Sequence, residues 1–90
     1  EVFNSNGGGC MPKAGYLEQV RDLCSQYGIV LCFDEVITGF RTSLSGAQGM
    51  VGVTPDITIF GKALAGGMPL AAVAGEKEIF DLKTILKLVV

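Results

Sequence analysis

The sequence has no histidine, only three cysteines and no excess of basic residues, and each absence argues against a class of protein. Histidines and paired cysteines are the usual protein ligands of zinc. Cys10, Cys24 and Cys32 show no paired spacing, so we expect neither a metal site nor a disulfide framework. Seven basic against nine acidic residues give a formal charge of −2, without the clustered basic face that nucleic acids require.

The sequence also lacks long apolar runs and a leader pattern. No run is long enough to cross a bilayer, and no charged segment precedes a short apolar region with a cleavage site. We therefore expect no membrane partner. Cys24 and Cys32 fall within apolar patterns and are predicted to be small core residues. Unpaired cysteines are typical of a reducing compartment, so we expect an intracellular protein, in the cytoplasm or an organelle.

What the sequence has in abundance is apolar surface. The apolar content is 49% in a chain of 90 residues. A chain of this size buries only about 60–65% of its unfolded surface and is marginally stable alone. We therefore expect a fragment of a larger core, with faces that other elements cover.

The hydrophobic pattern predicts alternating helices and strands. Apolar residues recur at helical spacing from Tyr16 to Tyr27, and Gly28 follows as a cap. Residues 29–33 form a continuous apolar run, typical of a central parallel strand that is covered on both faces. Further strands are predicted at residues 56–60 and 70–74, with a short helical turn near residues 44–50 and a helix from 76 to 82.

Two loops connect these elements. Residues 4–9 contain three glycines but lack the lysine and hydroxyl residue of a phosphate-binding P-loop, so a plain connector is favoured. Residues 36–55 form a connection of a length that is usually functional.

Two charged residues follow the ends of predicted parallel strands. Asp34 ends the first apolar run, and Lys62 follows the second. Ligands of open α/β sheets bind at the carboxyl ends of strands. A lysine there can form a Schiff base with a carbonyl, and an acid beside it can pair with the protonated ring nitrogen of pyridoxal phosphate. The alternatives are a solvated loop lysine and an aspartate that caps a turn or pairs with a neighbouring cation.

Three blocks carry a resemblance to a known family: residues 33–41 (FDEVITGFR), 52–56 (GVTPD) and 61–70 (GKALAGGMPL). At this spacing the sequence resembles the class III pyridoxal-phosphate-dependent aminotransferases, and most of all the glutamate-1-semialdehyde aminomutase branch. The resemblance implies the large domain of a fold-type-I enzyme, with a mostly parallel α/β sheet and flanking helices. Residues 1–82 would belong to that domain, and 83–90 would be a divergent or truncated end.

The resemblance also implies roles for individual residues. Lys62 matches the lysine that forms the Schiff base and moves the substrate proton. Asp34 matches the acid on the pyridine nitrogen, and Val36 the residue that packs on the ring. Glu35 is expected to be a structural hydrogen-bonding acid, whereas Arg41 either contacts substrate or forms an ion pair that holds the long loop. Ser5 stands where the family often has glycine.

The implied activity is transfer or intramolecular exchange of an amino group between small molecules, with pyridoxal 5′-phosphate as cofactor and a homodimer as the full-length assembly. One alternative is an ω-amino-acid or amine:pyruvate transaminase. Another, from a different class, is a non-catalytic fragment of such an enzyme, because ninety residues alone are expected to be inactive.

Overall fold

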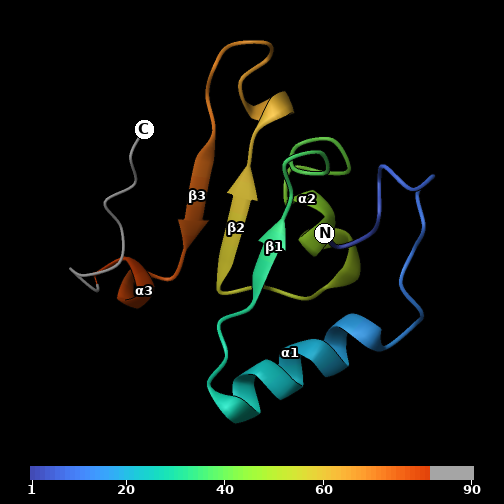
Figure 1. The fold of residues 1–90 in the computed structure, drawn as a ribbon, viewed down its shortest axis with the longest axis vertical. Coiled ribbons are helices and arrows are strands. Elements are labelled where there is room, and N and C mark those ends of the chain that lie inside the picture. Colours follow the sequence, from blue (N-terminus) through green and yellow to red (C-terminus); the bar gives the residue numbers. More distant parts are fainter. Residues whose placement is uncertain (82–90) are drawn as a thin grey trace.

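Three short strands form one mixed sheet in this computed structural model, which describes residues 1–81 (Figure 1). The strands are β1 (Cys32–Asp34), β2 (Ile57–Phe60) and β3 (Ala72–Gly75), in that spatial order. β1 and β2 run parallel, with Phe33 opposite Thr58, whereas β3 is antiparallel to β2. The predicted α/β fold class is confirmed. The prediction of a divergent end at 83–90 lies outside the described residues.

Helices precede and follow these strands. They are α1 (Tyr16–Tyr27), α2 (Gly46–Val51), the single 3-10 turn η1 (Lys62–Leu64) and α3 (Lys77–Asp81). The predicted end of the first helix is confirmed: Gly28 adopts φ 65°, and its backbone N–H donates to the carbonyl of Cys24. This left-handed conformation is strained for residues with a Cβ atom, which explains the glycine.

A small core joins the N-terminal segment to the helices and to β1. Its members are fully or almost fully buried apolar side chains, namely Val2, Leu17, Phe33, Ala47 and Val53. Burying a side chain as large as that of Phe33 contributes about 1.5–3 kcal/mol. Because this core lies behind β1, it fixes the strand whose end carries Asp34.

The buried face of α1 differs from the predicted one. Leu17 is buried, whereas Tyr16 and Tyr27, which the apolar pattern placed on the inner face, are 56% and 68% exposed. Arg21 also lies on the inner face, because its guanidinium pairs with Asp56. This polar anchor turns the helix away from the orientation that apolar spacing alone would favour.

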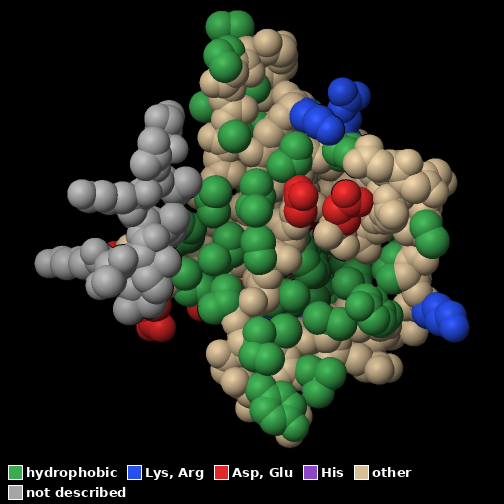
Figure 2. Space-filling model, in the orientation of Figure 1, with side chains coloured by type: hydrophobic (Ala, Val, Ile, Leu, Met, Phe, Trp, Pro, Cys, Tyr) green, Lys and Arg blue, Asp and Glu red, His purple; other side chains and the backbone are tan. Residues whose placement is uncertain are grey.

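Three burial predictions are wrong for the sheet. β1 lies at an edge of the described sheet and not at its centre, and Ile29 and Val30 are more than half exposed. Cys32 is exposed, and so is every residue of β3. The cause is that residues 1–81 supply no strand beyond β1 and no layer over β3. Figure 2 shows the resulting spread of apolar side chains across this face of the sheet.

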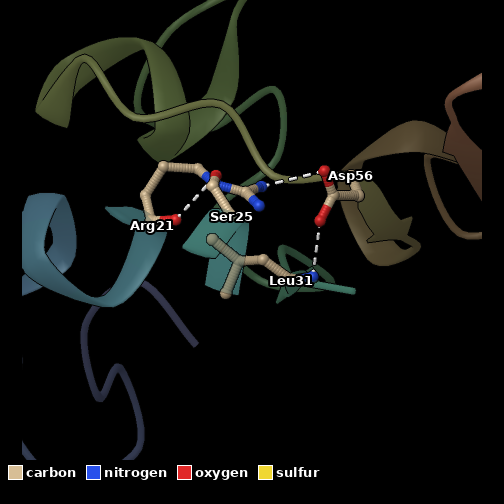
Figure 3. Close-up of polar contacts among 4 residues, drawn as sticks. All are labelled: Arg21, Ser25, Leu31 and Asp56. Atoms are coloured by element: carbon tan, nitrogen blue, oxygen red, sulfur yellow. Dashed lines mark hydrogen bonds and ion pairs between the residues drawn. The ribbon is translucent and has the colours of Figure 1, made fainter. Parts of the chain in front are cut away.

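Asp56 ties α1 to the starts of both parallel strands (Figure 3). One carboxylate oxygen lies 2.9 Å from the Arg21 guanidinium, and the other accepts a 2.6 Å hydrogen bond from the Leu31 N–H. The Arg21 side chain also donates to the Ser25 hydroxyl. Burial alone would raise the pKa of Asp56, but the Leu31 hydrogen bond and the hydrogen bond and charge of Arg21 together lower it.

Candidate functional site

The carboxyl ends of β1 and β2 meet at one hollow. Asp34, the last residue of β1, is paired with Ile59 of β2, so Lys62 follows only a short distance beyond. Asp34, Val36 and Lys62 all line a cavity of about 120 Å³. In Figure 2, acidic side chains lie side by side near these strand ends, and basic side chains lie above them with other atoms between. The structure thus brings the three predicted site residues together, at the edge of the sheet where ligands of α/β folds bind.

The backbone around Lys62 is unusual. Lys62 has φ 42°, one of two non-glycine residues with positive φ in the described part of the chain. Its carbonyl accepts hydrogen bonds from the N–H groups of Ala65 and Gly66, which hold the 3-10 turn in place. Backbone strain of this kind clusters at functional sites, where the surrounding structure must maintain it.

Lys62 is exposed in the described structure. Within residues 1–81 it takes part in no ion pair. Its amine is therefore available at the mouth of the hollow.

Asp34 both caps a turn and leaves one carboxylate oxygen available. Its Oδ1 accepts a 3.0 Å hydrogen bond from the Val36 N–H, so the predicted turn-capping alternative is seen in the structure. Among the described residues, its second oxygen accepts no hydrogen bond. One oxygen thus fixes the side chain, and the other can accept from a ligand.

A wider hollow adjoins the first one. It has a volume of about 390 Å³, includes Arg41 and shares Lys62, Ser5, Ile37 and Thr38 with the smaller cavity. This volume lies in the range of small-molecule sites. Arg41 is exposed and pairs with no acid among residues 1–81, so of its two predicted roles the ion pair that would hold the long loop is not formed there.

The sequence did not predict the other residues that line the hollow: Ile37 and Thr38 in the turn after β1, and Glu1, Ser5 and Asn6 near the start of the chain. The last three are the less expected ones. They belong to the N-terminal segment and to the loop that was interpreted as a connector. The burial of Val2 and a backbone bridge between Asn4 and Cys10 place this loop over the strand ends. The Ser5 hydroxyl oxygen is buried without a hydrogen-bond partner in the described structure. No local sequence signal indicates this placement, because it depends on long-range packing.

The described residues contain neither a cluster of metal ligands nor a membrane-spanning helix. Nowhere in residues 1–81 do three or more potential metal ligands gather. No helix in this part of the chain combines the length and apolar character needed to span a membrane.

Comparison with known proteins decides the family. The sequence model of the family described as "Aminotransferase class-III" matches residues 1–87. The chain belongs to this family. Class III aminotransferases depend on pyridoxal 5′-phosphate, which agrees with the resemblance found in the three sequence blocks.

Individual class III relatives support the same assignment. The glutamate-1-semialdehyde 2,1-aminomutase of Cytophaga hutchinsonii is 58% identical over 81 residues, which cover 90% of this chain and 19% of that protein. An ω-transaminase structure from Sphaerobacter thermophilus has a TM-score of 0.70 and 45% identity, covering 73% of this chain and 15% of that one. A structure titled "Transaminase with PLP bound" has a TM-score of 0.84 and 32% identity, and the match covers 97% of this chain and 20% of that chain. The chain therefore spans about a fifth of the length of its curated relatives.

Proposed function

We propose that this segment carries the cofactor-binding lysine and acid of a full-length pyridoxal-phosphate enzyme that moves an amino group within or between small molecules. The observation that carries the proposal is the shared hollow of Asp34 and Lys62 at adjacent parallel strand ends. The residues present fit the cofactor, because a primary amine, a carboxylate with one available oxygen and an apolar side chain line the same space. The buried Ser5 hydroxyl adds a polar group without a partner in the described structure.

Each residue has a distinct role in this proposal. The Lys62 amine would hold the cofactor covalently through its aldehyde carbon, with loss of water. Once the substrate's own amine has displaced it from that carbon, the freed Lys62 amine would carry the proton to and from the substrate carbon. The free oxygen of Asp34 would accept a hydrogen bond from the protonated ring nitrogen of the cofactor, and Val36 would supply an apolar contact to the ring. When bound, the cofactor supplies an electron sink for the negative charge that forms on the substrate.

Arg41 is proposed to contact the substrate. Its guanidinium borders the wider hollow next to Lys62 and has no acid partner in residues 1–81. A guanidinium binds carboxylates through paired hydrogen bonds, so a substrate with a carboxylate group suits this side of the hollow.

The identity of 58% to an aminomutase favours intramolecular exchange of the amino group, with glutamate-1-semialdehyde as the substrate to test first. The ω-transaminase likeness at 45% identity supports the alternative of transfer between two molecules. Conversion of the semialdehyde alone indicates an aminomutase. A strict requirement for an amine and pyruvate together indicates a transaminase.

The assignment of Lys62 is tested by chemical trapping in the full-length protein that contains this segment. The protein is incubated with pyridoxal 5′-phosphate, reduced with borohydride and digested, and the labelled peptide is located by mass spectrometry. We expect the label on Lys62, no label at this site in Lys62→Ala, and an unchanged label in Lys13→Ala, because Lys13 borders a different hollow. Covalent trapping of Lys62→Ala at another active-site lysine contradicts the assignment.

We also propose that the full-length protein is a homodimer, as the family resemblance implies. Sedimentation equilibrium of the full-length protein tests this directly. A monomer at micromolar concentration contradicts the proposal.

A further inference from the structure

Glu35 is the one acid in the described residues that is fully buried, with 0% of its surface exposed. Its carboxylate accepts four hydrogen bonds: from the Thr38 hydroxyl (2.9 Å), the Ala47 N–H (2.6 Å), the Gln48 N–H (3.0 Å) and the Gln48 side-chain amide (3.1 Å). A buried carboxylate is tolerated only when donors surround it in this way. The cluster therefore fixes the position of Glu35 with respect to the start of α2.

Glu35 lies between two residues of the proposed cofactor site but faces the other way. Asp34 ends β1, and in an extended strand successive side chains point to opposite faces of the sheet; Val36 already lies in the turn that follows. Asp34 and Val36 line the hollow, whereas Glu35 points toward α2. The Glu35 N–H donates to the carbonyl of Ile59, so the strand pairing continues through this residue.

The same cluster reaches the second parallel strand. The Gln48 amide donates both to Glu35 and, at 3.2 Å, to the hydroxyl of Thr58 in β2. Thr58 is itself buried. The strand that ends in Asp34 and the strand that leads to Lys62 are thus joined by side chains as well as by backbone pairing.

We propose that Glu35 is a positioning residue of the cofactor site. Its four hydrogen-bond donors hold it on the α2 side of the strand end, and this sets the direction in which Asp34 and Val36 project into the hollow. This inference rests on the proposed function. Glu35 touches neither the hollow nor a reacting atom, so it acts through Asp34.

The substitution Glu35→Gln separates this role from simple space filling. Glutamine has nearly the same size, but one of its terminal atoms is an NH₂ donor. In either orientation of the amide, that donor would face a backbone N–H, of Ala47 or of Gln48, which can only donate. The segment must move to relieve this conflict, and Asp34 moves with it.

The test uses the full-length protein loaded with pyridoxal phosphate that carries ¹⁵N in the ring. The readouts are the ¹⁵N shift of the ring nitrogen, the circular dichroism of the cofactor's visible band, and kcat and KM separately. We expect Glu35→Gln to displace the ¹⁵N signal in the direction that Asp34→Asn does, with the covalent link to Lys62 retained. The loss in kcat should reach at most about 100-fold, as for a misplacement of about 1 Å.

Two further variants keep the test decisive. Gln48→Met removes the side-chain amide but leaves the carboxylate and its three other donors, so it should shift the same signals to a smaller extent. Glu18→Gln, an exposed acid on α1, should leave them unchanged. Parental ¹⁵N and dichroism signals in a folded Glu35→Gln protein overturn the proposal. If that variant does not fold, parental signals in Gln48→Met overturn it.

The unmodified protein shows separately whether the proposed function itself holds. A full-length protein without a covalent cofactor at Lys62 overturns both proposals before any variant is made. Covalent cofactor at Lys62 together with parental signals in the Glu35 variant overturns only the positioning role.

Discussion

Gly46 and Glu35 touch so closely that no side chain fits between them. A Cβ atom added to Gly46 would overlap with the Glu35 carboxylate, and Gly46 also has a φ of 66°. Only glycine adopts this backbone conformation without a penalty. The start of α2 thus depends on a glycine in order to bring its N–H groups onto a buried acid.

Substitution of Gly46 by alanine should therefore destabilise the protein. The overlap and the left-handed backbone together should lower the free energy of unfolding by about 1–3 kcal/mol. Gly61→Ala is the matched control, because Gly61 is extended (φ −163°) and an added Cβ would lie 3.4 Å from Val36 Cγ1. Urea unfolding of both variants in the full-length protein measures the difference. Equal unfolding midpoints would contradict the described contact.

Replacing Asp34 by asparagine should slow the reaction without unfolding the protein. The asparagine oxygen can still accept the Val36 N–H, so the turn is retained. The negative charge of the carboxylate, which would face the ring nitrogen of the cofactor, is lost. A hydrogen bond to a charged group is worth about 1.5–3 kcal/mol. We expect kcat to fall about 10–100-fold in single-turnover measurements. A rate equal to that of the parent would mean that Asp34 only caps its turn.

The contribution of Asp56 should depend on pH. Its pKa is lower in the folded than in the unfolded chain, so its stabilising effect is present at neutral pH and is lost as pH falls through the folded-state pKa. Asp56→Asn should destabilise the protein by about 1–3 kcal/mol at pH 7 and by less at pH 3. Hydrogen exchange of the Leu31 amide reports this locally. Asp22→Asn, which replaces an exposed acid of α1, serves as the control and should leave the exchange of the Leu31 amide unchanged.

The 90-residue chain on its own should associate. Large apolar side chains such as Leu23, Ile29 and Val30 are more than half exposed, and β1 and β3 are edge strands in the described sheet. Exposed edges and apolar faces favour pairing with other chains. Light scattering at rising concentration should show mass above that of the monomer. A monomer with one sharp cooperative melting transition would contradict this.

Sequence patterns predicted the elements and the strand-end site because both depend on local signals. The Gly28 cap, the helical spacing of residues 16–27 and the apolar runs ending at Asp34 and Lys62 are all short-range features. The conformations that these features favour follow from local backbone geometry, and the rest of the chain changes them little.

The features that the sequence did not predict correctly depend on contacts between residues that are far apart in the chain. The apolar spacing of α1 does not reveal that Arg21 lies on the inner face of the helix, because its partner Asp56 is far along the chain. The four donors to Glu35 likewise come from the turn after β1 and from the start of α2, and no short-range pattern encodes how this part of the chain folds back onto Glu35. The approach of Ser5 and Asn6 to the strand ends has the same origin.

The side chains of Asp34 and Glu35 point in opposite directions. The proposed site therefore depends more on the number of residues in β1 than on which residues they are. Inserting or deleting one residue within β1 would exchange the two faces of the strand end. The anchoring carboxylate would then point into the hollow, and the ring-facing one would be buried against α2. Conservative replacements in Cys32–Asp34 leave this order intact, whereas a shift of a single position reverses it.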